Sequence, residues 1–201
     1  MDFNEALAQV ISITARPDKV IEATVAINAA ISKCSVRASF AKDLVEASLP
    51  IDNTLYGDTL QFDNVTPTPL VTRFRKFKYV KPTGVLYYLK PIGADQVFTP
   101  GFNIQKDRYY VGGNNITYTL SALANFLEIG YYQFPVTLDA VTNTEHWMLD
   151  IMPYVIIDLA CARIFQGIGD DSSAKMHKMS GEEDFKIHKN DHEDSILIGA
   201  Q

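Results

Sequence analysis

The chain has 201 residues, a formal net charge of -6, 47% hydrophobic residues and 21% charged residues. This length suits one ordinary domain, or a small domain carrying a sub-domain, and the composition is that of a globular protein. No apolar run approaches the ~18 residues needed to cross a bilayer, and the first residues lack the basic region and apolar core of a signal peptide. We therefore expect synthesis in a cytoplasm and no membrane partner.

Two helices are predicted at the start of the chain. Apolar residues recur at helical spacing from Phe3 to Ile11, which predicts a short amphipathic helix over residues 2–14. Pro17 suits the first turn of a second helix, where its missing N–H costs nothing. Apolar and alanine residues at intervals of three and four extend this second helix to about Glu46.

The middle of the chain, residues 49–138, is predicted to be an antiparallel β-rich module, because the hydrophobic period changes to two. The predicted strands are residues 55–62, 73–81, 85–89, 108–111, 116–120 and 127–134. Phe74 and Phe77 are three residues apart, so a β-bulge near Arg75 and Lys76 would bring both rings to one face, followed by Tyr79. Residues 85–89 are apolar throughout, which predicts a central strand covered on both sides.

The last predicted helix occupies much of residues 139–168. Thr142 to Glu145 has the spacing of a capping box, and apolar residues from Trp147 to Phe165 follow it. Pro153 should kink this helix or remove one of its hydrogen bonds. Because the helix is apolar nearly all round, it is expected either to lie at the centre of the fold or to meet another subunit.

Residues 169–201 are strongly acidic and predict an extended C-terminal tail. Two interpretations stay open: a disordered segment, or a docking arm that gains order when it binds a partner. In the second interpretation four apolar residues would be the docking residues, Phe185, Ile196, Leu197 and Ile198. The overall prediction is an α+β fold, with a helical bundle from residues 1–48 and 139–168, the β-rich module between them, and this tail.

Between Asn64 and Ala94 the sequence holds six basic residues and no acidic residue. The basic residues are Arg73, Arg75, Lys76, Lys78, Lys81 and Lys90. The first five lie on one predicted strand, which has three interpretations: a solvated face that guards a sheet edge, a contact with a partner protein, or a surface facing DNA phosphates. The sequence alone leaves the three open.

The sequence shows no catalytic signature, because a nucleophile elbow, a P-loop and a dinucleotide fingerprint are all missing from it. His188 and His192 are four residues apart, a spacing that can chelate a metal, but no third ligand is in a suitable place and a solvated arm is favoured. We expect a protein that is not an enzyme and that binds no metal and no cofactor. Cys34 and Cys161 are expected to be buried free thiols.

The layout of the chain resembles the head-to-tail adaptor proteins of short-tailed bacteriophages, the tail tubular protein A group. The similarity spans residues 1–170 and consists of layout and diffuse motifs: a helical start, a β-rich middle and an apolar helix bearing Trp147. The motifs are Arg73-Phe74-Arg75-Lys76 and Ile129-Gly130-Tyr131-Tyr132-Gln133-Phe134-Pro135-Val136-Thr137-Leu138.

The resemblance implies a structural protein of the virion neck, in which a dodecameric ring of copies joins the portal to the tail. In that family the helical part contacts the portal and neighbouring copies, and the β part meets the tail nozzle protein. Double-stranded DNA passes through the lumen without sequence-specific recognition. Other expectations are another neck or tail component, such as a tail-completion protein, or a nucleic-acid-binding β module.

Overall fold

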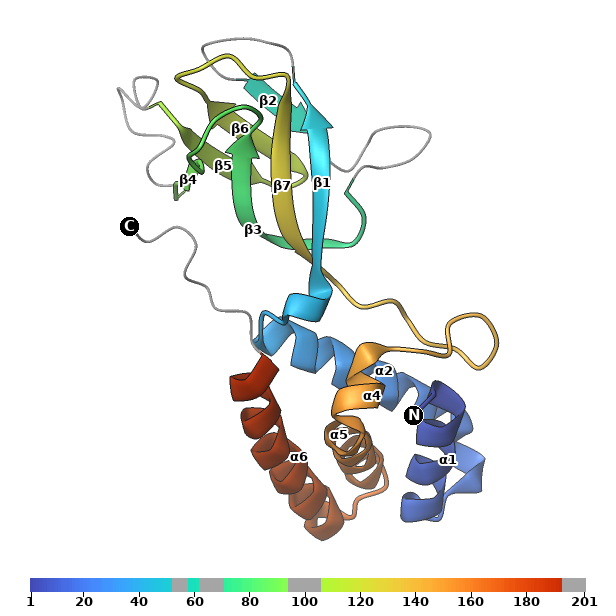
Figure 1. Cartoon of the computed structure of the whole chain (residues 1–201). Helices are drawn as coiled ribbons and strands as arrows, with labels where there is room; N and C mark the ends of the chain where they lie inside the picture. Colours follow the sequence, from blue (N-terminus) through green and yellow to red (C-terminus); the bar gives the residue numbers. More distant parts are fainter. Residues whose placement is uncertain (52–57, 62–70, 94–105, 193–201) are drawn as a thin grey trace. The chain divides into compact units, whose positions relative to one another are not determined.

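A computed structural model describes residues 1–51, 58–61, 71–93 and 106–192 (Figure 1). The predicted α+β class is confirmed. The chain forms two compact units: a helical unit from Met1–Asp43 and Phe134–Asp194, and a β unit from Leu44–Gln133. The chain passes from one unit to the other after Asp43 and again after Gln133. Both positions are five residues earlier than the sequence pattern predicted.

The helical unit contains five α-helices among its described residues. They are α1 (Phe3–Thr14), α2 (Val20–Arg37), α4 (Trp147–Ile151), α5 (Pro153–Gly167) and α6 (Asp171–His192). Short 3-10 turns at Pro17–Lys19 and Ala41–Asp43 flank α2. In the part of the chain that the structure describes, no helix is both long enough and apolar enough to span a membrane.

The α5 helix is the centre of the helical unit. It packs against α1, α2, α4 and α6, and eight of its residues are buried (Figure 1). The sequence left open two explanations of its all-round apolar surface, a central position in the fold or a contact with another subunit. The structure shows the central position. Its composition therefore gives no argument for a second subunit.

The start of this apolar segment differs in detail from the prediction. Pro153 does interrupt the helix: α4 ends at Ile151, Met152 leaves helical geometry, and Pro153 begins α5. The capping box at Thr142 does not form. Instead the Thr142 N–H donates to the carboxylate of Asp139, and the His146 ring accepts from the backbone of the first turn of α4. The Asp139 carboxylate accepts the Thr142 N–H within a turn, so Thr142 is already hydrogen-bonded before the helix begins.

The second helix is shorter than predicted, because α2 ends at Arg37 and not near Glu46. Ala38 is extended, and Phe40 inserts into the core, where its ring meets the Trp147 ring edge-on at 5.0 Å. The Trp147 indole N–H donates to Asp43 at 2.8 Å. The following residues form strand β1 (Leu44–Pro50), whose alternating pattern the alanine-rich neighbourhood concealed.

The prediction of an extended tail is wrong for residues 171–192, which form the 22-residue helix α6 against α5. Phe185 is 1% exposed. The centroid of its ring lies 6.3 Å from that of Phe40 and 4.8 Å from the Arg37 guanidinium carbon. Phe185 therefore belongs to the core and cannot serve as an exposed docking residue. Ile196, Leu197 and Ile198 lie outside the described residues.

The β unit holds two sheets. The first has the order β1-β7-β3, and the second has the order β2-β6-β5-β4. The remaining strand bounds are β2 (Asp58–Gln61), β3 (Phe74–Pro82), β4 (Lys90–Pro91), β5 (Arg108–Gly112), β6 (Asn115–Thr119) and β7 (Phe126–Gln133). All described pairings are antiparallel except the short pairing of β4 with β5. The predicted hairpin of β5 and β6 is confirmed, with Gly112 opposite Asn115.

The predicted bulge in β3 is confirmed, since the pairing with β7 shifts between Phe74 and Lys76. The Phe74 and Phe77 rings accordingly lie on one face, with centroids 4.6 Å apart. A second shift between Phe77 and Tyr79 was not predicted. It turns Tyr79 to the opposite face, so Tyr79 does not join the two phenylalanines.

The prediction of a central strand over residues 85–89 is wrong. These residues form an irregular connection, and Leu86 is fully exposed. After the turn at Thr83 and Gly84 the chain bonds back to β3, the outer strand of its sheet, at Leu89, whose N–H donates to the Val80 carbonyl at 2.8 Å. An apolar run that follows an outer strand therefore predicts neither a further strand nor burial of all its residues.

We predict that Phe185→Ala lowers the free energy of unfolding by about 3–5 kcal/mol, the usual cost of removing a buried phenylalanine. Chemical denaturation of the full chain measures the change. The matched control is Ile187→Ala, two residues along α6 and 57% exposed, which should change stability little. Equal effects of the two substitutions would contradict the placement of Phe185 in the core.

Candidate functional site

The basic residues of β3 are partly neutralised by their own sheet. The Lys81 ammonium lies 3.6 Å from the Glu128 carboxylate of β7. The Arg75 guanidinium and the Lys76 ammonium lie over the Tyr132 ring, at 5.2 and 5.3 Å from its centroid. The structure thus brings these cations together with acceptors on the neighbouring strand, and not into one uncompensated patch.

The remaining basic residues of this segment are dispersed. Arg73 precedes β3 in a left-handed conformation and donates to the Gln133 side chain at 2.8 Å. Lys78 lies half-buried at the second bulge, and Lys90 is exposed on β4 in the other sheet. Of the five predicted partner-facing residues, the register places Lys76 and Lys81 on one face, whereas Arg73 lies outside the strand and Lys78 lies at a bulge.

The face of the first sheet that carries Lys81 also carries two carboxylates, Glu128 on β7 and Glu46 on β1. The register places Glu46 of β1 beside Gly130 of β7, and Tyr79 of β3 on the other side of Gly130. The Tyr79 hydroxyl donates to Glu46 at 2.5 Å. Desolvation, aided by that carboxylate, raises the pKa of the Tyr79 phenol well above its usual value.

A histidine, an aspartate and a serine meet between α5 and α6. Asp158 lies between the other two: it accepts from Ser180 at 2.6 Å and contacts the His177 ring nitrogen at 2.8 Å. In a catalytic triad the histidine must lie between the nucleophile and the acid. Here the aspartate is central, and both described hydrogen bonds of the cluster run to Asp158, so the cluster joins two helices.

The other histidines form no ligand set with neighbouring side chains. The rings of His188 and His192 stack on α6, with centroids 6.1 Å apart. Among residues 1–51, 58–61, 71–93 and 106–192, no group of three or more metal-binding side chains comes together.

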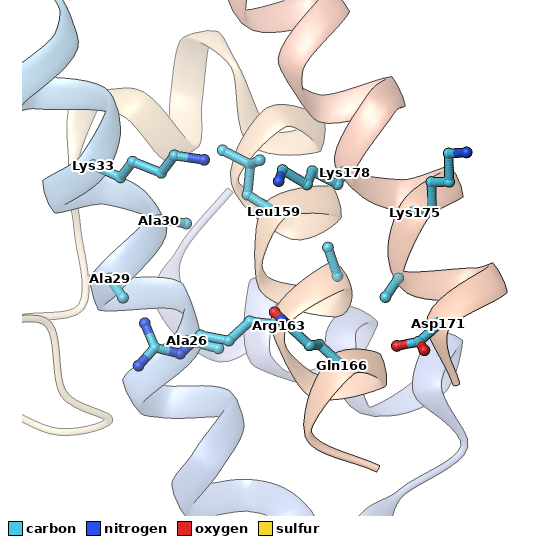
Figure 2. A pocket seen from close by; sticks show the side chains of 12 residues that line it. Ala26, Ala29, Ala30, Lys33, Leu159, Arg163, Gln166, Asp171, Lys175 and Lys178 are labelled. Carbon is cyan, nitrogen blue, oxygen red and sulfur yellow. The ribbon is translucent and has the colours of Figure 1, made fainter. Parts of the chain in front are cut away.

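A groove of about 650 Å³ lies between α2, α5 and α6 of the helical unit (Figure 2). We call it the cationic groove. Small side chains and one leucine form its floor: Ala26, Ala29, Ala30, Leu159 and Ala162. Alanine floors let an incoming peptide or helix approach the backbone closely.

Four basic side chains stand around this floor, Lys33 on α2, Arg163 on α5, and Lys175 and Lys178 on α6. One acid, Asp171, accompanies them. Lys33 and Lys178 extend toward one another from opposite walls (Figure 2). Like charges that face each other across a groove favour an anion between them.

Of the four cations, Lys33 is engaged, because it forms a 2.7 Å ion pair with Glu182. In the described part of the chain, Arg163, Lys175 and Lys178 make no ion pair and no side-chain hydrogen bond. The helical unit as a whole is acidic, with seventeen acidic and ten basic residues in Met1–Asp43 and Phe134–Asp194. Three unpaired cations in one groove of an acidic unit mark a candidate site.

A smaller apolar cleft of about 370 Å³ adjoins the groove, and Arg163 lines both. Ile21 and Val25 of α2 and Ile168, just beyond α5, contribute apolar surface to it. Ile21 is 78% exposed and Val25 52% exposed. Exposed aliphatic side chains beside a charged groove are typical of an interaction surface.

Sequence reasoning missed this site, because its basic residues are spread over 146 positions from Lys33 to Lys178 and form no charge run. A partial signal existed. Lys175 and Lys178 are three apart, and on a helix this spacing places them on one face. The expectation of an extended tail prevented that interpretation.

No family model matches this chain, and no curated protein matches it significantly in sequence.

We predict that Gly130→Ala destabilises the β unit by about 1–3 kcal/mol, the usual cost of overpacking. A Cβ at this position would lie 2.3 Å from Tyr79 Cε1, so the Tyr79 ring must move. Urea unfolding measures the loss. Gly167→Ala is the control, since a Cβ there has open space. The double variant with Tyr79→Ala should lose less than the sum of the single changes, and full additivity would contradict the clash.

We predict that Glu182→Gln weakens the helical unit at neutral pH and that the difference from wild type shrinks in acid. The hydrogen bond from Lys33, followed by that from Arg37, lowers the pKa of Glu182 below its usual value of 4.5. A lowered pKa gives stability that is present above the unfolded-state value and lost as pH falls through the folded-state value.

Urea midpoints at pH 7 and pH 3 measure this effect. Glu183→Gln, at the exposed neighbouring position, is the control. An undiminished deficit of the Glu182 variant at pH 3 would contradict the electrostatic cause.

Proposed function

We propose that this protein is a structural subunit of a phage virion, a head-to-tail adaptor whose copies form a ring between portal and tail and enclose the DNA exit channel. The observation that carries the proposal is the layout. Both ends of the sequence build one helical unit, and a β unit is inserted between them. This is the helical–β–helical order of the adaptor group that the sequence resembles.

The surface of the helical unit supports assembly with other proteins. The apolar helix α5 packs against helices of its own chain, so its apolar surface is not evidence for a contact with another subunit. The exposed aliphatic side chains of α2 and the unpaired cations of the cationic groove take its place. Exposed Ile21 and Val25 beside unpaired basic groups support an interaction surface at this place.

The β unit supports a protein contact better than a DNA contact. Lys81 is paired with Glu128, and Arg75 and Lys76 lie over an aromatic ring. Glu46 and Glu128 share the sheet face with Lys76 and Lys81, and carboxylates repel phosphates. Arginine and tyrosine, which this face also carries at Arg75, Tyr79 and Tyr132, are residue types enriched in protein interfaces. In the proposed ring this unit meets the tail nozzle.

We predict that the purified protein forms a closed ring in the presence of the portal protein encoded with it. Native mass measurement and electron microscopy, each with and without portal, test this expectation. Particles that lack the protein should package DNA but then leak it or fail to attach a tail. Normal infectious particles without the protein would refute the proposal.

A DNA-binding role would give a different result. The isolated chain would then bind DNA with an affinity that falls steeply with salt, because phosphate contacts release counterions. Such binding, lost on Lys76→Glu, together with no ring in the presence of portal, would replace the adaptor proposal with the nucleic-acid-binding alternative.

A further inference from the structure

We propose that the segment Glu193 to Ile198 of one copy docks into the cationic groove and apolar cleft of a second copy. This inference rests on the proposed function, since it requires copies that assemble. It names the contact by which neighbouring subunits would be joined. The groove belongs to the described helical unit, and the docking segment is identified by its sequence.

The chemistry of the segment complements the site in order along the chain. Glu193 and Asp194 come first, then one serine, and then Ile196, Leu197 and Ile198. The groove offers three cations that no described side chain neutralises, and the adjoining cleft offers exposed aliphatic surface. The two acids of the segment can therefore contact the cations of the groove, while the aliphatic residues that follow them enter the apolar cleft.

The spacing also agrees. Leu197 comes four positions after Glu193, and an extended chain covers about 13 Å over that distance. Groove and cleft share the Arg163 side chain as a lining residue. One short extended segment can therefore hold its acids at Arg163, Lys175 and Lys178 while its apolar residues enter the cleft.

The same chain cannot place its own segment there. The apolar cleft lies at Gly167 and Ile168, just before the start of α6, whereas the segment follows the other end of that helix. The 22 residues of α6 put these ends about 32 Å apart at 1.5 Å per residue. Six residues beyond His192 extend at most about 21 Å. A second copy must therefore supply the segment.

A nucleic-acid strand fits the site less well. Phosphates would satisfy the cations, but a strand has no aliphatic side chains for the cleft beside Ile21 and Val25. A single charged groove with an alanine floor also lacks the aromatic platforms on which bases stack.

The test measures binding of a fluorescent peptide of residues 191–201 to the full-length protein by anisotropy. We expect saturable binding that Lys175→Glu with Lys178→Glu weakens at least tenfold. The control carries Lys42→Glu with Lys186→Glu, the same charge change at exposed positions outside the groove, and should bind like wild type. A peptide with Glu193→Lys and Asp194→Lys should prefer the reversed groove to the wild-type groove.

Disulfide trapping tests whether the contact joins two copies. The native thiols stay unreactive, because burial raises the pKa of Cys34 and of Cys161 to about 12. Copies with Ile196→Cys are mixed with copies carrying Val25→Cys, and a mixed disulfide is expected. Copies with Ala8→Cys, exposed on α1, are the control and should not cross-link.

Four results would overturn the inference: no peptide binding at millimolar concentration, binding that ignores the groove variants, equal cross-linking of the Ala8→Cys control, or a disulfide closed within one dilute chain carrying both cysteines. The proposed function fails separately. Peptide binding without a ring in the presence of portal would refute the adaptor alone, and a ring without peptide binding would refute this docking alone.

Discussion

Enclosure of α5 is the constraint on which the helical unit depends. A helix that is apolar nearly all round must be covered on every side, and the cost of exposing one large aliphatic side chain is about 1.5–3 kcal/mol. The coverage comes from α1 and α2 at one end of the sequence and from α4 and α6 at the other. Phe185 contributes to this coverage, which is why an acidic segment becomes a packed helix.

A unit built from both ends of the sequence must accommodate the residues between them. The β unit allows this because its first strand and its last strand are paired neighbours. Leu44 at the start of β1 lies opposite Tyr132 near the end of β7. The chain therefore leaves the helical unit and returns to it through two neighbouring strands of one sheet. The inserted β unit thus does not force the two sequence halves of the helical core apart.

The sequence predicted the features that local patterns determine. The α+β class, the β5–β6 hairpin, the first bulge of β3 and the break at Pro153 all follow from turn residues, spacing or proline geometry. The errors came where tertiary contacts decide. Phe40 ends α2 early because its ring belongs with Trp147, and Phe185 orders α6 despite its charged neighbours. The candidate site was missed because three helices far apart in sequence compose it.

The two positively charged regions show why a charge run is a weak guide to a charged surface. The run on β3 is basic in sequence, yet sheet pairing brings Glu128 beside Lys81 and sets an aromatic ring beneath Arg75. The cationic groove has no run at all, yet folding gathers cations from three helices and leaves Arg163 and Lys178 unpaired among the described residues. Charge that folding neutralises stabilises the chain itself, whereas charge that folding leaves unpaired is free to act on a partner.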